Sequence, residues 1–172
     1  MKIFTIRKLT VEDADTLWAL RLQSIREHPT MFFSSYEEMT DRKLDEFKKT
    51  YPASEDQFIL GAWGESEQLI GMVGFRKAPV SKNIMNHGNL WGLYVQASYQ
   101  NLGIGKQLIE AMLDALQEMK DLTAVTLGVM SHNEAAIHVY QQFGFELYDV
   151  EKDAFTYKGQ SYDHQLMIRW MS

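Results

Sequence analysis

Apolar residues recur along the chain with two different spacings, and each change of spacing marks a boundary between elements. Residues 90–95 form an apolar and aromatic run typical of a strand, whereas from Ile104 to Leu116 the apolar residues return every three or four positions, as on one face of a helix. Gly103 and Gly105 lie at the junction. We therefore predict a strand that passes through a glycine turn into a helix.

The same spacings, with proline and glycine as boundaries, place the other elements. Helices are predicted from Thr10 to just before Pro29, over residues 44–51, and after residue 130, where Ser131 and Glu134 form a capping box. The segment between the first two helices is predicted to be irregular, and residues 64–67 and 158–161 are predicted hairpin turns. The predicted strands are 3–7, 58–63, 68–75, 90–95, 123–130, 146–157 and 162–170. The order is strand, two helices, three strands, helix, strand, helix, two strands.

Residues 100–105, Gln-Asn-Leu-Gly-Ile-Gly, have the composition of a loop that holds phosphate. Glycines let the backbone approach a ligand closely, and the N–H groups of a helix start favour an anion. A dinucleotide fingerprint would need a third glycine where Leu108 stands, and a P-loop would need glycine at Gln100 and Ser or Thr at Gln107. Both motifs are excluded, while a tight turn with no ligand stays open.

A second pattern follows on the helix after strand 123–130. Asn133 and Tyr140 are seven residues apart, which places them within about 20° of the same helix face. Gly144 stands at the position of a C-terminal cap. Taken singly, Asn133 as a helix-start residue and Tyr140 as a core aromatic are ordinary structural roles.

Together the two patterns resemble the signatures of the GNAT superfamily, the acyl-CoA-dependent N-acetyltransferases. Residues 100–105 resemble its Gln/Arg-x-x-Gly-x-Gly/Ala loop, and residues 133–145 resemble its Asn-x-x-Ala-x-x-x-Tyr-x-x-x-Gly-Phe signature. Close similarity covers residues 88–146. The resemblance implies an α/β (α+β) fold, a single domain over residues 1–172, with a mixed, mostly antiparallel central sheet of about seven strands and helices on both faces.

The resemblance also implies acetyl-CoA as the acyl donor and a set of residues that bind it. In the family the glycine loop binds the pyrophosphate, a splayed strand pairs with the pantetheine arm, and the tyrosine lies near the thioester sulfur as the catalytic donor. Those roles carried to this chain give the cofactor-binding set Leu93, Tyr94, Val95, Gln100, Asn101, Leu102, Gly103, Ile104, Gly105, Lys106, Asn133 and Tyr140, with Tyr140 as the catalytic residue.

The proton acceptor and the acyl acceptor are less determined. Many family members carry a glutamate on the splayed strand, but residues 88–92 contain no carboxylate, so Glu37, Glu38, His87 and a water chain all stay open. In the family the segment between the first two helices lines the acceptor pocket. This segment contains Phe32, Phe33 and Tyr36, and we expect Phe32, Tyr36 and Glu38 to bind the amine substrate.

Composition narrows the remaining classes of function. A length of 172 residues suits one domain, and the absence of cysteine excludes disulfides and a thiolate nucleophile. A net charge of −6 disfavours nucleic acid as a partner. The five histidines lack the spacing of metal ligands, so we expect no metal. No apolar run is long enough to span a membrane and no signal peptide is evident, so we expect a cytoplasmic protein.

Two classes of function follow from this sequence. The first is an enzyme that transfers the acetyl group of acetyl-CoA to a primary amine of a small molecule, by direct attack in a ternary complex. The alternatives are a noncatalytic acyl-CoA-sensing or partner-binding module on the same fold, and acetylation of a protein or peptide amine. A homodimer stays open.

Overall fold

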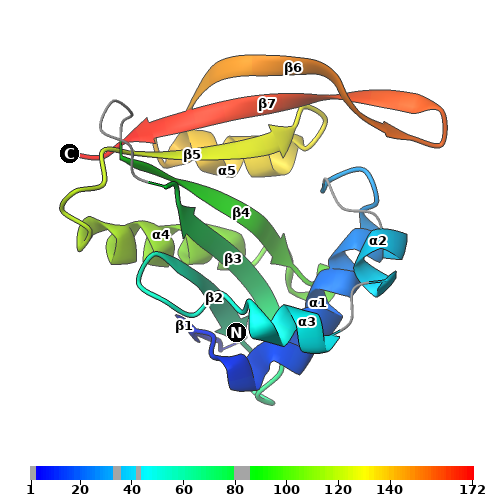
Figure 1. The fold of residues 1–172 in the computed structure, drawn as a ribbon, viewed down its shortest axis with the longest axis vertical. Coiled ribbons are helices and arrows are strands. Elements are labelled where there is room, and N and C mark those ends of the chain that lie inside the picture. The colour runs from blue at the N-terminus through cyan, green and yellow to red at the C-terminus, as the bar shows by residue number, and fades with distance from the viewer. Residues whose placement is uncertain (1–2, 33–35, 42–43, 80–85) are drawn as a thin grey trace.

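Seven strands form one sheet, with helices on both of its faces, in the computed structural model (Figure 1). The structure describes residues 3–32, 36–41, 44–79 and 86–172. The helices are α1 (Ala14–Glu27), α2 (Tyr36–Asp41), α3 (Leu44–Lys49), α4 (Ile104–Gln117) and α5 (Glu134–Gln142), with short 3₁₀ segments at Val11–Asp13 and Ala97–Tyr99. The strands are β1 (Thr5–Lys8), β2 (Gln57–Trp63), β3 (Leu69–Lys77), β4 (His87–Val95), β5 (Ala124–Met130), β6 (Glu146–Tyr157) and β7 (Gln160–Trp170).

The strand order is β1-β2-β3-β4-β5-β7-β6, and β4–β5 is the one parallel pair in this sheet. Antiparallel neighbours need only short turns, whereas the parallel pair requires a crossover, and α4 supplies it. The predicted mixed, mostly antiparallel sheet with helices on both faces is confirmed.

Two apolar clusters cover the two faces of the sheet. On one face, α4 and α5 pack in a cluster that includes Leu108, Leu127 and Tyr140. On the other face, α1 and α3 pack in a cluster that includes Leu17, Phe47 and Tyr94. Because β2 and β3 are buried over most of their length, they are apolar on both sides rather than alternating.

β4 and β5 separate part-way along their length. Their pairing runs from His87 with Ala124 to Leu90 with Leu127, and beyond it the residues of β4 from 91 to 95 have no partner on β5. Gly92 has a φ of +69°, a left-handed backbone that glycine adopts without strain, and β4 is irregular at this point against β3. The backbone polar groups of this end of β4 therefore face a gap in the sheet.

The structure corrects four details of the sequence prediction. The segment expected to be irregular contains α2, and helix α3 ends at Lys49, before Tyr51. The expected capping box of Ser131 and Glu134 is wrong, because Asn133 is the N-cap of α5. The last hairpin turns through only Lys158 and Gly159, both with positive φ, so β7 begins earlier than predicted.

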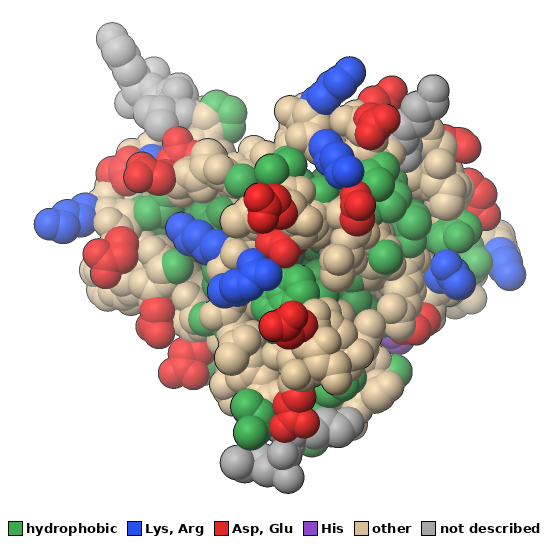
Figure 2. All heavy atoms as spheres, turned by 90° about the horizontal axis from the view of Figure 1, so that it is seen from below, with side chains coloured by type: hydrophobic (Ala, Val, Ile, Leu, Met, Phe, Trp, Pro, Cys, Tyr) green, Lys and Arg blue, Asp and Glu red, His purple; other side chains and the backbone are tan. Residues whose placement is uncertain are grey.

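The surface carries charges of both signs. On the face drawn in Figure 2, acidic and basic side chains of the described residues are interspersed around apolar atoms. No helix within the described ranges is long and apolar enough to cross a membrane.

Candidate functional site

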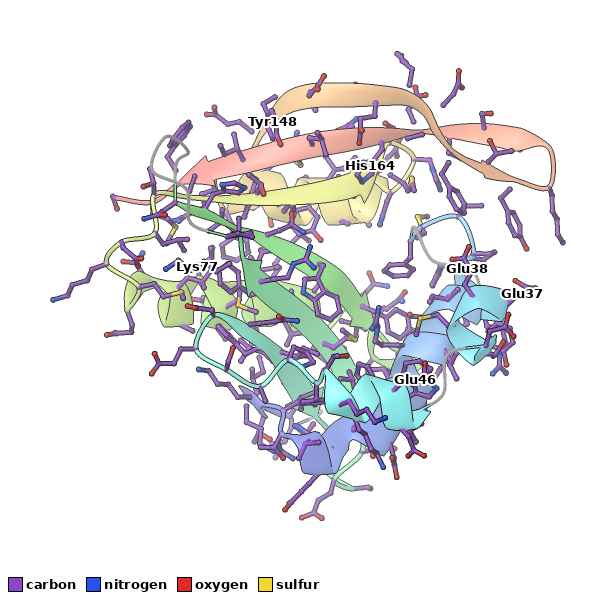
Figure 3. All side chains as sticks on the ribbon, in the orientation of Figure 1. Glu37, Glu38, Glu46, Lys77, Tyr148 and His164 are labelled. Atoms are coloured by element: carbon purple, nitrogen blue, oxygen red, sulfur yellow. The ribbon has the colours of Figure 1, made fainter. Side chains whose placement is uncertain are left out.

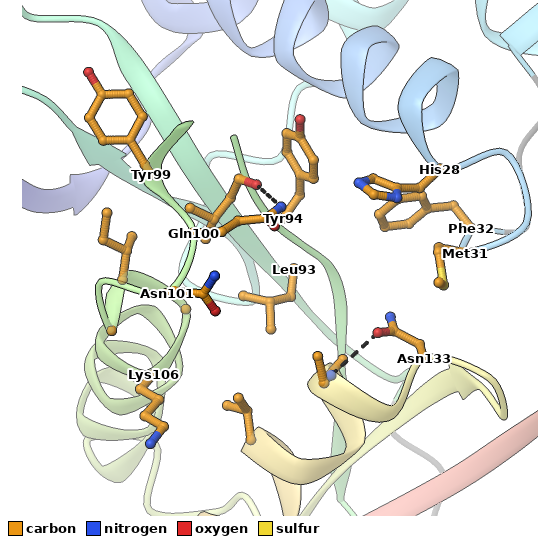
Figure 4. Close-up of a pocket in the computed structure, with 17 residues that line it drawn as sticks. His28, Met31, Phe32, Leu93, Tyr94, Tyr99, Gln100, Asn101, Lys106 and Asn133 are labelled. Carbon is orange, nitrogen blue, oxygen red and sulfur yellow. Dashed lines mark hydrogen bonds between the residues drawn. The ribbon is translucent and has the colours of Figure 1, made fainter. Parts of the chain in front are cut away.

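A cavity of about 460 Å³ opens where the sheet divides, between the end of β4, the start of α4, the start of α5 and the loop after α1 (Figure 4). Its size is typical of a small-molecule site. Figure 4 shows Gln100, Asn101 and Lys106 at one end, and His28, Met31 and Phe32 with Asn133 at the other. The lining residues are His28, Met31, Phe32, Leu93, Tyr94, Val95, Tyr99, Gln100, Asn101, Gly103, Ile104, Gly105, Lys106, Asn133, Ala135, Ala136 and Val139.

The start of α4 exposes backbone N–H groups to this cavity. Gly103 is the N-cap with a φ of +81°, and no side chain caps the helix. The first intrahelical bond runs from the amide of Gln107 to the carbonyl of Gly103, so the N–H groups of the first turn have no partner inside the helix. Asn101 is also left-handed, with a φ of 64°. This end of the cavity is built to accept an anion.

Gly105 is the position at which the absence of a side chain points to a ligand. A Cβ at Gly105 would meet only Val95 Cγ2, at 3.9 Å, which is ordinary van der Waals contact. Within a helix, glycine is less stable than alanine by about 1 kcal/mol. Since no described protein atom requires glycine here, the open space beside it fits a group from outside the chain.

Gln100 closes the loop in front of α4. Its side-chain amide donates a hydrogen bond to the carbonyl of Val95 at 2.9 Å, which joins the end of β4 to the glycine loop (Figure 4). Gln100 therefore stabilises the loop that presents Gly103, in addition to lining the cavity.

Asn133 lies where α5 begins and faces the cavity from the other side. Its side-chain oxygen accepts a hydrogen bond from the amide of Ala136 at 3.3 Å (Figure 4). This is the ordinary role of an N-cap asparagine. The side-chain NH₂ group is a separate donor, so the cap does not use up its hydrogen-bonding capacity.

Tyr94 connects β4 to the end of α1. Its hydroxyl donates to Glu27 Oε2 at 2.5 Å, and its ring meets His28 edge-on at 6.1 Å. Burial, together with this hydrogen bond, raises the pKa of Tyr94, whereas the bonds from Tyr94 and Gln23 lower the pKa of Glu27. The pair fixes the Tyr94 side chain while its backbone lies along the cavity.

The loop after α1 reaches across to the loop before α5. Thr30 Oγ1 and His132 Nε2 are 3.0 Å apart, and the His132 ring lies 4.8 Å from that of Tyr162 on β7. This contact joins segments that are far apart in the sequence and holds Met31 and Phe32 beside the cavity.

Tyr140 lies beneath the site rather than in the cavity wall. Its side chain is 7% exposed, belongs to the cluster of α4 and α5, and packs against Phe145. Burial raises the pKa of Tyr140. The Tyr140 hydroxyl has no hydrogen-bond partner among the described residues. Its O–H can therefore donate a hydrogen bond to a group from outside the chain.

The cavity brings together most of the residues expected to bind the cofactor. Leu93 to Val95, Gln100, Asn101, Gly103 to Lys106 and Asn133 line it, while Leu102 and Tyr140 do not. Leu102 is 47% exposed. No metal-binding group of three His, Asp or Glu side chains occurs in the described part of the chain.

Only one of the three residues expected to bind the amine lines the cavity. Phe32 lines the cavity, whereas Tyr36 and Glu38 on α2 do not, and Phe33 lies outside the described residues. The ring of Tyr36 is covered by the guanidinium of Arg26, whose carbon lies 5.1 Å from the ring centre. The cation that contacts the Tyr36 ring in this structure is therefore the guanidinium of Arg26.

The residues considered as proton acceptors lie apart from the cavity. Glu37 is exposed on the outer edge of α2 (Figure 3), and Glu38 is on the same short helix. His87 is at the start of β4, paired with Ala124, at the end opposite to the gap. None of the three lines the cavity.

Sequence reasoning missed His28, Met31, Tyr99, Ala135 and Val139 as lining residues. Ala135 and Val139 are four residues apart and share one face of α5, but neither lies at same-face spacing from Asn133, so the motif alone does not indicate them. His28 and Met31 reach the cavity only through the tertiary contact of Thr30 with His132, for which the sequence offers no local signal.

The model of the "Acetyltransferase (GNAT) family" matches residues 22–145, which is most of the chain. The chain belongs to the GNAT family. The GNAT match runs from the second half of α1 to just beyond α5 and includes both sequence signatures.

Relatives and solved structures agree with this GNAT assignment. The spermine/spermidine N(1)-acetyltransferase of Bacillus subtilis (strain 168) is 28% identical over 80 residues, covering 45% of this chain and 53% of that protein, so the match spans about half the length of this relative. The N-alpha-acetyltransferase of Sulfurisphaera tokodaii is 25% identical over 152 residues, covering 84% of this chain and 81% of the relative.

Two solved structures share the GNAT fold. An acetyltransferase of the GNAT family from Streptococcus pneumoniae has a TM-score of 0.82 at 23% identity, covering 99% of this chain and 100% of that one. The structure of yncA from Salmonella typhimurium with its cofactor acetyl-CoA has a TM-score of 0.82 at 18% identity, covering 99% of this chain and 95% of that one. At these identities the likeness concerns the fold.

Proposed function

We propose that this GNAT protein transfers the acetyl group of acetyl-CoA to a primary amine of a small molecule, by direct attack within a ternary complex. The observation that carries the proposal is the open space at Gly105, at the uncapped start of α4. Family membership supplies the class of reaction, and this space supplies the place for the donor.

The glycine loop fits the pyrophosphate of the coenzyme. Residues of the first turn of α4, whose N–H groups have no partner inside the helix, line the cavity, and Lys106 adds a positive charge to this lining. Because Gly105 has no Cβ, an anion can approach the backbone closely at this position. The residues present therefore fit the diphosphate that distinguishes coenzyme A from simpler thiols.

The free edge of β4 fits the amide-rich pantetheine arm. Residues 91–95 have backbone groups without a partner on β5, and such an edge forms strand-like hydrogen bonds with an extended ligand. Asn133 offers an amide donor from the opposite wall. In this arrangement Leu93 to Val95 and Asn133 hold the arm from two sides.

The chemistry sets two demands on the residues around the thioester. An alkyl amine with a pKa near 10.4 is mostly protonated at pH 7, so forming the free amine costs about 4 to 5 kcal/mol. The departing thiol is more acidic than a tyrosine by about 1.5 pKa units. Burial raises the pKa of Tyr140 further. Tyr140 therefore acts as a hydrogen-bond donor to the developing thiolate rather than as an acid that ionises.

The contact of Thr30 with His132 favours a small acceptor. It joins the two loops beside the cavity at 3.0 Å and packs them against Tyr162, which restricts the width available to a folded protein. Acetylation of a protein or peptide amine is the alternative, since one relative is named as an N-alpha-acetyltransferase.

Thioester cleavage by the purified protein tests the proposal. Free thiol is followed with acetyl-CoA and a panel of polyamines, amino acids, aminoglycosides and short peptides, while calorimetry measures coenzyme A binding. We expect binding, and thiol release that depends on one class of small amine. Binding with no thiol release across the panel would favour a noncatalytic acyl-CoA-sensing role. Release with peptides alone would favour the alternative acceptor.

A further inference from the structure

A turn after α1 forms the end of the cavity that lies opposite to the start of α4 (Figure 4). The amide of Met31 donates to the carbonyl of His28 at 3.1 Å, which closes the turn. Pro29 stands at the second position of this turn, where the fixed φ of proline is favoured. The turn brings His28 and Met31 together with Phe32 on one wall of the cavity, which we call the turn wall.

The turn wall is apolar except for its imidazole. Phe32 is partly buried and packs against the cluster of α1 and α3. Met31 is partly buried as well, but in the described part of the chain it belongs to neither apolar cluster. An unbranched thioether side chain of this kind adapts to the shape of an apolar partner. Leu93 on β4 continues the apolar lining toward the middle of the cavity (Figure 4). This end of the cavity is therefore suited to an apolar group of a ligand.

The carboxylate next to the turn wall in the sequence is engaged by other residues. Glu27 accepts hydrogen bonds on both oxygens, from the Tyr94 hydroxyl at 2.5 Å and from the side-chain amide of Gln23 at 2.9 Å. Neither Asp nor Glu occurs among the described residues that line the cavity. The stretches of sequence outside the described ranges contain no Asp or Glu either. An ammonium group at the turn wall therefore meets no counter-charge from the described lining residues.

The polar groups around this end suit one amine but not a second charge. Backbone carbonyls of residues 91–95 face the gap in the sheet and can accept a hydrogen bond from the reacting amine. The imidazole of His28 is neutral or positive, and the free NH₂ group of Asn133 is a donor, so neither supplies a negative charge. Contact with the Phe32 ring offsets only part of the hydration that a buried ammonium loses.

We propose that the acyl acceptor is an amine with a single charged group and an apolar body, and that Met31 and Phe32 select it by contact with that body. This inference rests on the proposed acetyl transfer and names its class of substrate. Polyamines are selected against, because their second ammonium would lie at the turn wall without a partner.

The turn wall also favours the form of the amine that reacts. An apolar environment disfavours the ammonium relative to the neutral amine. One proton therefore leaves the ammonium for solvent before the attack. The amine nitrogen then forms a bond to the acetyl carbon while the carbon–sulfur bond breaks, and the sulfur takes the electron pair of that bond. A second proton of the nitrogen ends on the sulfur, so the products are the amide and the thiol.

Three amines with the same four-carbon chain test the inference on the intact protein. Butylamine ends in a methyl group, 1,4-diaminobutane in a second ammonium, and 4-aminobutanoate in a carboxylate. Thiol release from acetyl-CoA near neutral pH gives kcat/KM for each amine. We expect the value for butylamine to exceed the other two by about 10- to 100-fold, because an unpaired charge at an apolar wall loses its hydration.

A charge placed in the turn wall should reverse this preference. Met31→Glu offers a partner to the second ammonium, and Met31→Gln is the matched control of the same size without the charge. We expect the ratio of kcat/KM for 1,4-diaminobutane to that for butylamine to rise about tenfold in Met31→Glu relative to Met31→Gln. Phe32→Glu with Phe32→Gln repeats the comparison from the neighbouring position. Calorimetry with coenzyme A checks folding, because the loop that we propose to bind the diphosphate lies at the other end of the cavity.

Failure of this inference is distinct from failure of the proposed function. If the wild type transfers acetyl but uses amines with a second charge as well as butylamine, or better, the turn wall does not select an apolar body, although the proposed function stands. The same holds if the Glu and Gln variants share one preference at both positions. If the wild type binds coenzyme A and transfers acetyl to no amine of the broad panel, the proposed function itself fails.

Discussion

Tyr140 and Phe145 meet edge to face with their ring centres 5.8 Å apart, at the point where α5 ends. The amide of Phe145 donates to the carbonyl of Tyr140, and that of Gly144, with a φ of +87°, donates to the carbonyl of Gln141. This is a Schellman motif, in which the two residues joined by the longer bond commonly make an apolar contact. The end of the helix therefore fixes the Tyr140 ring, independently of any role of its hydroxyl.

The Tyr140 hydroxyl and the Tyr140 ring have separable roles. Tyr140→Phe keeps the ring contact and removes a hydroxyl with no hydrogen-bond partner among the described residues, so the free energy of unfolding should change little. We expect kcat for acetyl transfer to fall by about 10² to 10⁴, because the thiolate loses its donor. Urea unfolding and steady-state kinetics measure the two effects.

The control for this prediction is Tyr140→Ala. It removes the ring as well and should cost about 3 to 5 kcal/mol of stability. If Tyr140→Phe kept the wild-type kcat, the hydroxyl would have no part in acetyl transfer and the role of Tyr140 would be structural alone.

The raised pKa of Tyr140 also predicts how stability depends on pH. Unfolded tyrosine ionises near 10, whereas burial keeps the folded side chain neutral beyond that pH. The unfolded state therefore loses a proton that the folded state retains, so this contribution is present below pH 10 and is lost as the pH rises above it. At about pH 11 the free energy of unfolding of the wild type should fall by up to about 1 kcal/mol relative to that of Tyr140→Phe. At about pH 8 the two proteins should not differ in this respect. Urea unfolding of both proteins at the two pH values provides the measurement.

Asn133 combines a helix cap with a place in the cavity wall, and two substitutions separate these roles. Asn133→Ala should cost about 1 kcal/mol because α5 loses its cap, whereas Asn133→Ser keeps a capping oxygen and should cost little. Both remove the amide donor, so both should weaken coenzyme A binding by about 1 kcal/mol, or five- to tenfold. Calorimetry and thermal unfolding give the two quantities. Full affinity in Asn133→Ser would mean that the side chain serves α5 only.

The sequence predicts well what depends on local backbone geometry. The turn at Gly103 and the helix end at Gly144 follow from glycines at positive φ, and α4 follows from its apolar spacing. The glycine loop that we propose to bind the diphosphate could be located because that proposed role depends on the backbone itself. In contrast, α2 has six residues and a single buried side chain, Met39, so it has too little apolar periodicity to be recognised.

Features that depend on register between distant strands are not accessible in this way. His164 lies over Gly128 because β5 pairs with β7, with Met130 opposite His164, and no local pattern sets that register. The same holds for Glu151, which comes opposite His164 through an irregular hairpin. Local sequence patterns therefore do not bring these two side chains together.

The ion pair of Arg7 with Asp13 predicts an acid-sensitive contribution to stability. Arg7 donates two hydrogen bonds to the Asp13 carboxylate, at 2.9 and 3.1 Å, and these lower the pKa of Asp13. A lowered pKa means that the contribution is present above about pH 4, the unfolded value, and is lost as the pH falls through the folded value. Since half of the Arg7 side chain is exposed, the contribution is about 1 kcal/mol.

Asp13→Asn should therefore lower the unfolding free energy at about pH 7 and match the wild type at about pH 2. The control is Asp15→Asn, because the Asp15 side chain is 70% exposed and its pair with Lys48 should contribute almost nothing. Chemical unfolding across the pH range measures both. An Asp13→Asn deficit that persists at low pH would assign the effect to packing rather than to charge.

Gly105 and Gly103 should respond oppositely in stability and alike in binding. Gly105→Ala places a methyl group in open space on a helix, so the unfolding free energy should rise by about 0.5 to 1 kcal/mol. Gly103→Ala forces a side chain into a left-handed conformation at a φ of +81° and should cost about 1 to 2 kcal/mol.

Both substitutions should reduce the affinity for coenzyme A, measured by calorimetry, because the first turn of α4 can no longer present its amides at close range. Gly105→Ala shows whether weaker binding comes from lost space or from a destabilised fold. If this variant is more stable than the wild type and yet binds coenzyme A more weakly, it has lost only the space that the ligand needs. If it bound coenzyme A as the wild type does, the diphosphate would have to lie away from this turn, since an added methyl group beside it would otherwise collide with the bound anion.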